Sequence, residues 1–267
     1  MAMPDDANDR STDVALLEDG TLLQIRLNRP KGNVLTQAMM GEIGEALARH
    51  RDHPDLRLVV LQGTGGHFSF GASIEEHRQD RVRGMLHDFH ALARAIAAYP
   101  VPVAAVVEGR CLGGAFELVL CCHLVFATPS ARFACPEIKL GVLPPVLAAA
   151  GAARLGGALA ERMVVTGQEI DAAEAQRAGF VAQVFDDAAR VDELMLAWYR
   201  SSLRPLSAYA LRQAVAAARL GSGLVAALGG TLDEIERLYL DRVATSHDGN
   251  EGIDAYVARR SPVWTNR

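Results

Sequence analysis

Two glutamates in this 267-residue chain lie among apolar or small residues. Glu117 lies in the run CLGGAFELVLCCH, and Glu137 follows twenty residues later in CPEIKLG. An ionised carboxylate in apolar surroundings costs several kcal/mol unless it is paired, hydrogen-bonded or at a wet cavity. Two such carboxylates at one cavity would divide general acid and general base roles, because proximity and poor solvation separate their pKa values.

Each glutamate also has a structural interpretation. Glu117 in the first turn of a helix would interact with the helix dipole, a contribution of only about 0.3–1 kcal/mol. Glu137 would form an ion pair with Lys139 or Arg132. The residues alone leave both alternatives open.

Two glycine-bearing loops are candidates for an oxyanion site. GTGGHFSFGAS follows the apolar segment 56–62, and GRCLGG follows the apolar segment 101–107. Loops that enter helix N-termini present unpaired backbone N–H groups, and two that converge can hold a developing oxyanion. Ala72 and Gly114 would supply these groups. The alternative is that the glycines serve only tight turns; neither loop has the pattern of a phosphate-binding motif.

The elements that must position these residues alternate between strands and helices. Short strands are predicted on either side of the turn 18–20, and buried strands over 56–63 and 101–109. Helices are predicted over 36–53, 85–99 and the run 115–127, which is apolar on nearly every side. Segment 131–145 is predicted as strand and loop, followed by helix, turn and helix over 154–179. This alternation to about residue 185 predicts an α/β fold.

From about residue 186 the pattern is helical with no convincing strand. Leu232, Ile235, Leu238 and Tyr239 form an apolar stripe behind Thr231, which is predicted as a helix N-cap. The core of one chain is not expected to cover all of these apolar stripes, which predicts that they pack against other subunits. Residues 1–12 are predicted to be a mobile N-terminus.

Composition narrows the classes of function. Half of the residues are hydrophobic and 22% are charged, as in a folded globular protein. A net charge of −5 without any basic block argues against nucleic-acid and anionic-membrane surfaces. No apolar run reaches the roughly 18–20 residues of a membrane span. Four cysteines without a CxxC pair and a polar, acidic N-terminus predict a cytoplasmic protein with reduced thiols.

Several motifs together resemble the crotonase (enoyl-CoA hydratase/isomerase) superfamily. They are HFSFGASIEE, VPVAAVVEGRCLGGAFELVLCCH, ARFACPEIKLGVLP, VTGQEIDAAEAQRAGFV and NEGIDAYVARRSPVW, in that order from about Val14 to Trp264. The resemblance implies a spiral core of repeated ββα turns over residues 13–200. It also implies an all-helical C-terminal oligomerisation region over 201–267 that packs trimers, or dimers of trimers.

The resemblance also implies a site. Members bind acyl-CoA thioesters without metal or organic cofactor, and hold the thioester oxygen with two N–H groups that correspond to those of Ala72 and Gly114. The two glutamates with which hydratases activate water and move a proton correspond to Glu117 and Glu137. Further substrate-binding residues are predicted as Lys31, Asn33, Val34, Phe70, Gly71, Ser73, Ile74, Leu112, Gly113, Phe116, Leu143 and Pro145.

The chain departs from ordinary short-chain hydratases at several positions. Pro145 stands where a glycine N–H would help to hold the catalytic water, and a proline has no N–H. Phe70 replaces a small residue and Ser73 replaces an aspartate in the first loop, and KGNVL replaces a common NAL. These variants resemble the cyclohexa-1,5-diene-1-carbonyl-CoA hydratases of aromatic-acid breakdown. The resemblance therefore predicts hydration of a conjugated, cyclic dienoyl-CoA thioester.

Alternative functions are an ordinary enoyl-CoA hydratase or enoyl-CoA isomerase, and, from another class, a non-catalytic scaffold or an RNA-binding member of the superfamily. Retention of both glutamates argues against a scaffold, and the negative net charge argues against RNA. His67, His77, His87 and His90 are predicted to be surface residues and not metal ligands. Three arginines are predicted to form a solvated face, with contacts to CoA phosphates as the alternative: Arg78, Arg81 and Arg83.

Overall fold

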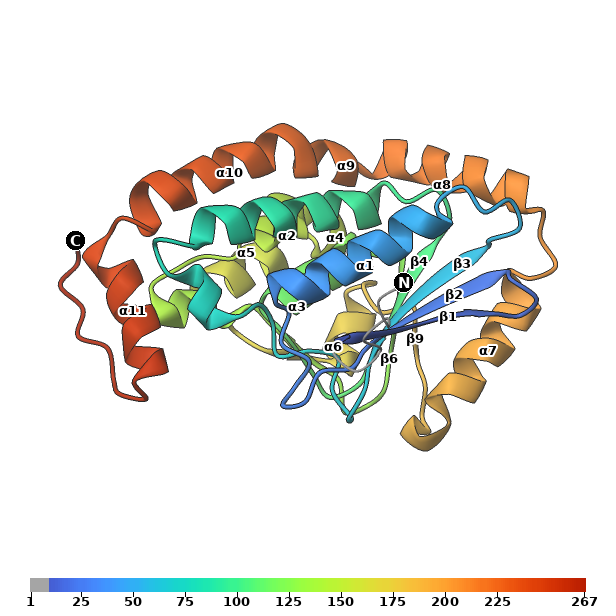
Figure 1. Cartoon of the computed structure of the whole chain (residues 1–267), viewed down its shortest axis with the longest axis horizontal. Helices are drawn as coiled ribbons and strands as arrows, with labels where there is room; N and C mark the ends of the chain where they lie inside the picture. Colours follow the sequence, from blue (N-terminus) through green and yellow to red (C-terminus); the bar gives the residue numbers. More distant parts are fainter. Residues whose placement is uncertain (1–9) are drawn as a thin grey trace, which may run out of the picture.

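The computed structural model describes residues 10–267 and is built around a six-stranded sheet (Figure 1). The strand order is β1-β2-β3-β4-β6-β9. The strands are β1 (Thr12–Leu17), β2 (Leu22–Leu27), β3 (Leu58–Gly63), β4 (Val103–Val107), β6 (Leu124–Ala127) and β9 (Gln183–Val184). β1 and β2 form the predicted antiparallel hairpin, and every later pair is parallel.

A second, three-stranded sheet is formed by strands that follow those of the first sheet along the chain. Its strands, in the order β5-β7-β8, are β5 (Arg110–Leu112), β7 (Arg132–Ala134) and β8 (Ile170–Asp171). β4 in the large sheet leads into β5 in the small sheet, and β6 likewise leads into β7. Since β5 and β7 pair in parallel as β4 and β6 do, successive turns of chain stack on one another.

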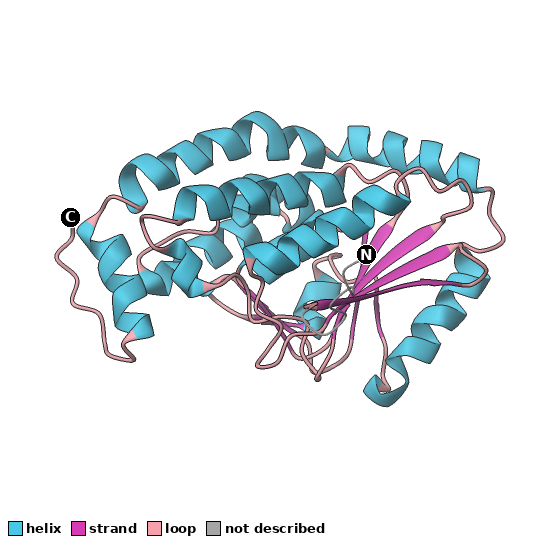
Figure 2. Cartoon of the chain, viewed as in Figure 1, coloured by secondary structure: helices cyan, strands magenta, loops and turns pink. Residues whose placement is uncertain are grey.

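Both faces of the large sheet are covered by helices, as Figure 2 shows. Leu23, Val59 and Ala105 point to one face and belong to the main core, while Leu22, Val60 and Ala104 point to the other face. The second face packs against α7 (Val191–Ser202). The remaining helices before residue 191 are α1 (Gln37–His50), η1 (Ile74–His77), α2 (Val82–Ala97), α3 (Gly114–Cys121), η2 (Pro136–Leu140), α4 (Pro145–Leu155), α5 (Gly157–Thr166), α6 (Ala172–Arg177) and η3 (Ala188–Arg190).

The C-terminal helices run along the outside of the core and then turn back onto it (Figure 1). They are α8 (Ala208–Ser222), α9 (Leu224–Ala226), η4 (Ala227–Thr231), α10 (Leu232–Leu238), η5 (Tyr239–Val243) and α11 (His247–Val257). α10 contacts α4, and α11 contacts both η1 and η2. The chain's last helices therefore close over segments that carry the candidate site residues.

The α/β fold and the helical C-terminal third are confirmed over the described residues. The helix predicted over 115–127 is wrong in its second half, because α3 ends at Cys121 and Leu124 begins strand β6. A run that is apolar on every side does not distinguish a buried helix from a buried strand. Thr231 is not a helix N-cap, since its φ of −64° and ψ of −44° continue the helix.

The predicted mobile N-terminus lies mostly outside the described residues, and Thr12 already belongs to β1. Subunit packing stays a prediction; the C-terminal helices leave Leu220 86% and Tyr209 74% exposed. Over residues 10–267, no single helix has the length and apolarity of a membrane span. Helical segments 208–222 and 224–243, which meet at an angle of 66°, together reach the length and apolarity of a span, by length and composition only.

Candidate active site

The first glycine-bearing loop leaves β3 and is fixed by bridges on both sides. Ser69 N–H donates to the Arg110 carbonyl at 3.0 Å, which ties the loop to β5. Further on, Leu35 N–H donates to Gly71 O and Ser73 N–H donates to Leu35 O, each at 2.9 Å. Successive N–H groups of an extended chain point to opposite sides, so the Ala72 N–H between these bonds points away from Leu35.

The second loop brings Gly114 against the first. Gly113 N–H donates to Ala134 O at 2.7 Å, and Gly114 begins α3, so its N–H has no partner within the helix. A Cβ built on Gly114 would lie 3.3 Å from the Ala72 Cβ. Among the described residues, neither the Ala72 nor the Gly114 N–H donates a hydrogen bond. Both groups line one cavity.

Glu117 lies on the first turn of α3 with its side chain 3% exposed. Its Oε1 accepts hydrogen bonds from the N–H groups of Val146 at 2.7 Å and Leu147 at 2.9 Å. These donors belong to the first turn of α4, which Pro145 begins at the position where a helix tolerates proline. Burial raises the pKa of Glu117 from 4.5 to about 7, and the two N–H donors oppose this rise. Glu117 lies in the first turn of its own helix, as the dipole interpretation requires, and is also hydrogen-bonded to the start of another helix.

Glu137 lies on η2, half-buried, at the same cavity. Its Oε2 is buried and accepts no hydrogen bond within the described residues. Gly113 has a φ of +52°, and a Cβ there would lie 2.7 Å from Glu137 Oε1. Burial, followed by the nearby charge of Glu117, raises the pKa of Glu137 well above its ordinary value of 4.5.

The alternative ion pairs of Glu137 are not formed. Arg132 lies 3.8 Å from Glu169, and in the described part of the chain neither Arg132 nor Lys139 pairs with Glu137. The two glutamates therefore line one cavity, and neither forms an ion pair with a residue that the structure describes.

The cavity has a volume of about 450 Å³ and mostly apolar walls. Eleven predicted site residues line it, namely Phe70, Gly71, Ala72, Ile74, Leu112, Gly113, Gly114, Glu117, Glu137, Leu143 and Pro145. The sequence interpretation missed other lining residues, which include Met85, Leu86, Phe89, Leu140, Val142, Tyr239 and Tyr256. Met85, Leu86 and Phe89 follow helical spacing on α2, but nothing in that spacing distinguishes a cavity wall from core.

Phe116 does not line the cavity, contrary to expectation. Its side chain is fully buried, and its ring packs against Phe133 at 5.5 Å and Phe180 at 5.6 Å between centroids. Phe116 directly precedes Glu117 on α3, and adjacent helical residues point in different directions. The Glu117 side chain reaches the cavity, whereas the Phe116 ring fills the core.

Lys31 and Asn33 lie at a second hollow of about 410 Å³, which shares Phe70 with the apolar cavity. Asn33 is 2% exposed, and its amide donates to the carbonyls of Thr64, His67 and Phe68. Asn33 therefore holds the loop in place, and Lys31 is exposed at the rim. Val34 and Ser73 line neither hollow.

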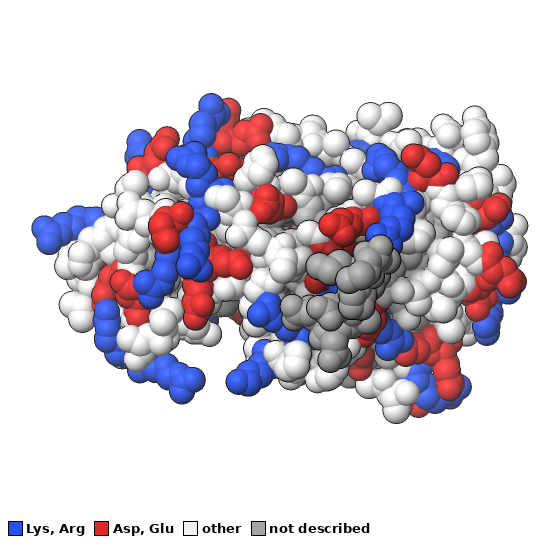
Figure 3. Space-filling model, viewed as in Figure 1, with Lys and Arg blue, Asp and Glu red and all other residues white. Residues whose placement is uncertain are grey.

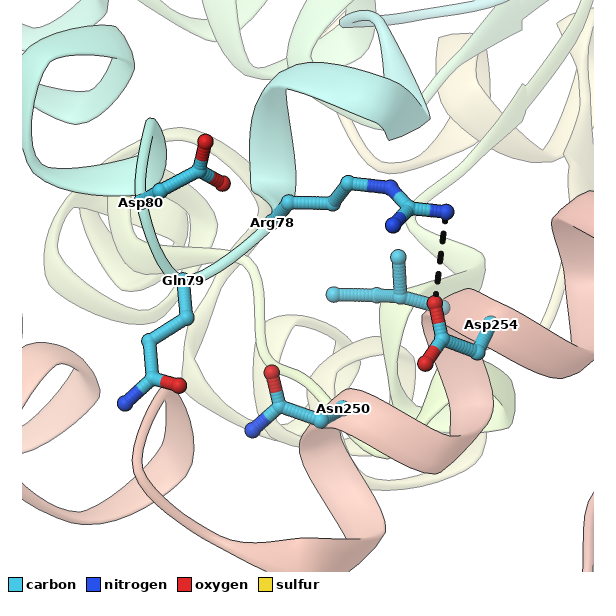
Figure 4. Close-up of a pocket in the computed structure, with 6 residues that line it drawn as sticks. Arg78, Gln79, Asp80, Asn250 and Asp254 are labelled. Carbon is cyan, nitrogen blue, oxygen red and sulfur yellow. Dashed lines mark ion pairs between the residues drawn. The ribbon is translucent and has the colours of Figure 1, made fainter.

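A third hollow is lined mostly by polar side chains, which Figure 4 shows. Arg78 reaches across it to Asp254 of α11, with 3.3 Å between Arg78 Nη2 and Asp254 Oδ1. The pair links the segment after η1 to the C-terminal helix. Acidic and basic side chains are interspersed over the face shown in Figure 3.

The histidine prediction is partly wrong. His90 is fully buried, and its Nδ1 lies 2.5 Å from Glu236 Oε2. His77 is half-buried and lines the apolar cavity. His67 is also half-buried, and His87 is exposed as predicted. Residues 10–267 contain no cluster of three or more residues that could ligate a metal.

Comparisons with known proteins identify the family of this chain. The family model for enoyl-CoA hydratase/isomerase matches residues 18–267. A cyclohexa-1,5-dienecarbonyl-CoA hydratase of Thauera aromatica is 41% identical over 95% of this chain and 96% of its own length. A 2,3-dehydroadipyl-CoA hydratase of Escherichia coli is 32% identical over 92% of this chain and 96% of its own.

Solved structures show the same fold. An enoyl-CoA hydratase from Mycobacterium avium subsp. paratuberculosis superposes with a TM-score of 0.78 at 30% identity, over 96% of this chain and 99% of the other. An enoyl-CoA hydratase/isomerase from Xanthobacter autotrophicus gives 0.82 at 25% identity, over 94% and 97%. The fold expected from the resemblance is confirmed. The chain belongs to the enoyl-CoA hydratase/isomerase family, in the crotonase superfamily, and is an enzyme of the enoyl-CoA hydratase type, a hydro-lyase.

Proposed function

We propose that the protein adds water to a conjugated acyl-CoA thioester whose acyl group is a cyclic diene. The observation that carries this proposal is the convergence of two carboxyl groups and two free backbone N–H groups on one apolar cavity. An apolar wall suits a hydrocarbon ring. The carboxyl pair supplies the two proton transfers that hydration requires.

Glu117 acts as the general base. Its carboxylate is held by two N–H groups at the start of α4, where the helix dipole favours negative charge. Its pKa of about 7 lies close to neutral pH, which is the best value for a base that takes a proton from water.

Glu137 acts as the general acid. Burial raises the pKa of Glu137 well above 4.5, and the charge of an ionised Glu117 raises it further, which favours the protonated form that a general acid needs. It donates this proton to carbon as water attacks. For a cyclic diene, the carbon that receives the proton is the more distant one of the conjugated system.

The N–H groups of Ala72 and Gly114 hold the thioester oxygen. As water adds, negative charge moves to this oxygen, and donors that are already oriented stabilise it without reorganisation. Loss of one such donor in other enzymes slows turnover by about 10²–10³-fold. No metal or organic cofactor takes part in this scheme.

The CoA part of the substrate would lie over Phe70 and the second hollow. Phe70 is 45% exposed and lines both spaces, and Arg29 and Lys31 at the second hollow offer cations to phosphate groups. Oligomer formation as a trimer or dimer of trimers, and a cytoplasmic location, remain part of the proposal.

A substrate panel tests the proposal. Purified protein is given cyclohexa-1,5-diene-1-carbonyl-CoA or crotonyl-CoA, and the change in thioester absorbance is followed together with the product mass, because protonation of the diene at its more distant carbon leaves one conjugated double bond in the product. We expect one water to be added to both, with kcat/KM at least about tenfold higher for the diene, the effect of about 1.4 kcal/mol of pocket contacts.

Other outcomes identify the alternatives. Faster hydration of crotonyl-CoA indicates an ordinary enoyl-CoA hydratase, and a shifted double bond without a gain of water indicates an isomerase. Binding of thioesters without any turnover indicates a scaffold. Each of these results contradicts the proposed substrate or the proposed reaction.

A further inference from the structure

Tyr239 carries a hydroxyl group that the protein buries without a partner. The residue begins η5, is 1% exposed and lines the apolar cavity. Its hydroxyl neither donates nor accepts a hydrogen bond among the described residues. Among the described residues that line the cavity, Glu137 Oε2 is the other buried side-chain oxygen without a partner.

The other deeply buried tyrosines differ from Tyr239. The Tyr99 hydroxyl donates to Leu47 O at 3.0 Å, and the Tyr199 hydroxyl donates to Thr21 Oγ1 at 2.5 Å. Leaving a buried hydroxyl unpaired costs about 1–3 kcal/mol, and phenylalanine would fill the same volume without this cost. The hydroxyl of Tyr239 therefore needs a partner that is not part of the chain.

The phenol is a permanent donor beside the carboxyl pair. Burial is the main cause that raises the pKa of Tyr239, and the charges of Glu137 and then Glu117 raise it further. The hydroxyl therefore keeps its proton at neutral pH.

The start of α4 has no N–H group that could donate to a ligand oxygen in place of Tyr239. Pro145 has no N–H, and the N–H groups of Val146 and Leu147 already donate to Glu117 Oε1. The Ala148 N–H donates to Pro144 O at 3.0 Å. The first turn of α4 therefore has no N–H left for a water molecule.

We propose that Tyr239 binds the water molecule that is added to the substrate, with its hydroxyl donating to the water oxygen while Glu117 accepts a water proton. This inference rests on the proposed function. Glu117 takes a proton from the water, and the water oxygen bonds to the β-carbon of the acyl group. Glu137 transfers its proton to the more distant carbon of the conjugated system. Tyr239 keeps its own proton throughout. The product hydroxyl then takes the place of the water.

The test compares Tyr239→Phe with Tyr209→Phe. Tyr209 is 74% exposed on α8, so the same change there serves as the control. Tyr239→Phe should lower kcat for hydration about tenfold, the effect of one hydrogen bond. It should weaken binding of the hydroxylated product about tenfold, and leave binding of the saturated acyl-CoA without a hydroxyl unchanged within about twofold. Its melting temperature should equal or exceed that of the wild type.

Two ligands are compared. The first is the hydration product of the substrate that reacts faster in the panel, and the second is a saturated acyl-CoA with the same carbon skeleton and no hydroxyl. If neither substrate reacts, the two ligands are 3-hydroxybutyryl-CoA and butyryl-CoA. Unchanged kcat and unchanged product binding in Tyr239→Phe overturn the inference. Equal weakening of both ligands, or a lower melting temperature, shows a structural hydroxyl and also overturns it. A wild type that hydrates nothing contradicts the proposed function, whereas the binding comparison still decides the role of Tyr239 because it needs no turnover.

Discussion

Replacement of Glu117 by glutamine should make the protein more stable and nearly inactive. The glutamine oxygen can still accept the N–H groups of Val146 and Leu147, so the start of α4 keeps its partner. The change removes only the ability to ionise. Turnover should fall at least about 10²-fold, the lower end for a general acid or base.

The stability gain follows from the pKa. A rise from 4.5 to about 7, at about 1.4 kcal/mol per pKa unit, amounts to about 3 kcal/mol. The folded state binds the proton more tightly than the unfolded state does. Stability from this source is therefore complete below pH 4.5 and is lost as the pH rises to about 7. Glu117→Gln does not titrate, so it avoids this loss.

Thermal unfolding of both proteins from pH 4.5 to pH 8 measures the effect. For a chain of this size about 1 kcal/mol corresponds to about 2–4 °C, so the variant should melt about 6 °C or more above the wild type at pH 8. The difference should shrink toward zero at pH 4.5. A difference that does not depend on pH, or a variant less stable than the wild type at pH 8, would refute the reasoning.

Three further variants test the rest of the site. Glu137→Gln should lower turnover at least about 10²-fold, with binding of a saturated acyl-CoA in calorimetry nearly unchanged; near wild-type turnover contradicts the paired-carboxyl mechanism. Gly113→Ala should lose most activity and about 1–2 kcal/mol of stability in urea unfolding, because its Cβ would lie 2.7 Å from Glu137 Oε1 at a φ of +52°; full activity would show that Glu137 need not hold this position. Lys31→Ala should raise KM for a CoA thioester about fivefold and leave KM for the matching pantetheine thioester unchanged, as loss of about 1 kcal/mol of phosphate contact predicts; an equal rise for both would place the phosphates elsewhere.

Local sequence predicted most elements because their signals are local. The hairpin around residues 18–20 and the strand before the first glycine loop follow from β-branched runs bounded by turn residues. The end of α3 did not follow, since Cys121 and Leu124 are both apolar and only strand pairing with β4 separates helix from strand. The two prolines before Val146 were a usable signal for a helix start, but the sequence interpretation assigned them to a loop.

What the sequence by itself determined was the inventory of the site: two carboxylates in apolar runs, two loops with free N–H groups, and the family motifs that join them. Only the tertiary structure shows which of them share one cavity. Glu117 reaches the start of α4 through contacts between residues 29 and 30 positions apart, and the N–H groups there oppose the rise of its pKa. Tyr239 joins them from more than a hundred residues away, because the C-terminal helices fold back over the cavity. A helical stripe in sequence cannot reveal this, since long-range packing alone decides whether a buried tyrosine faces core or substrate.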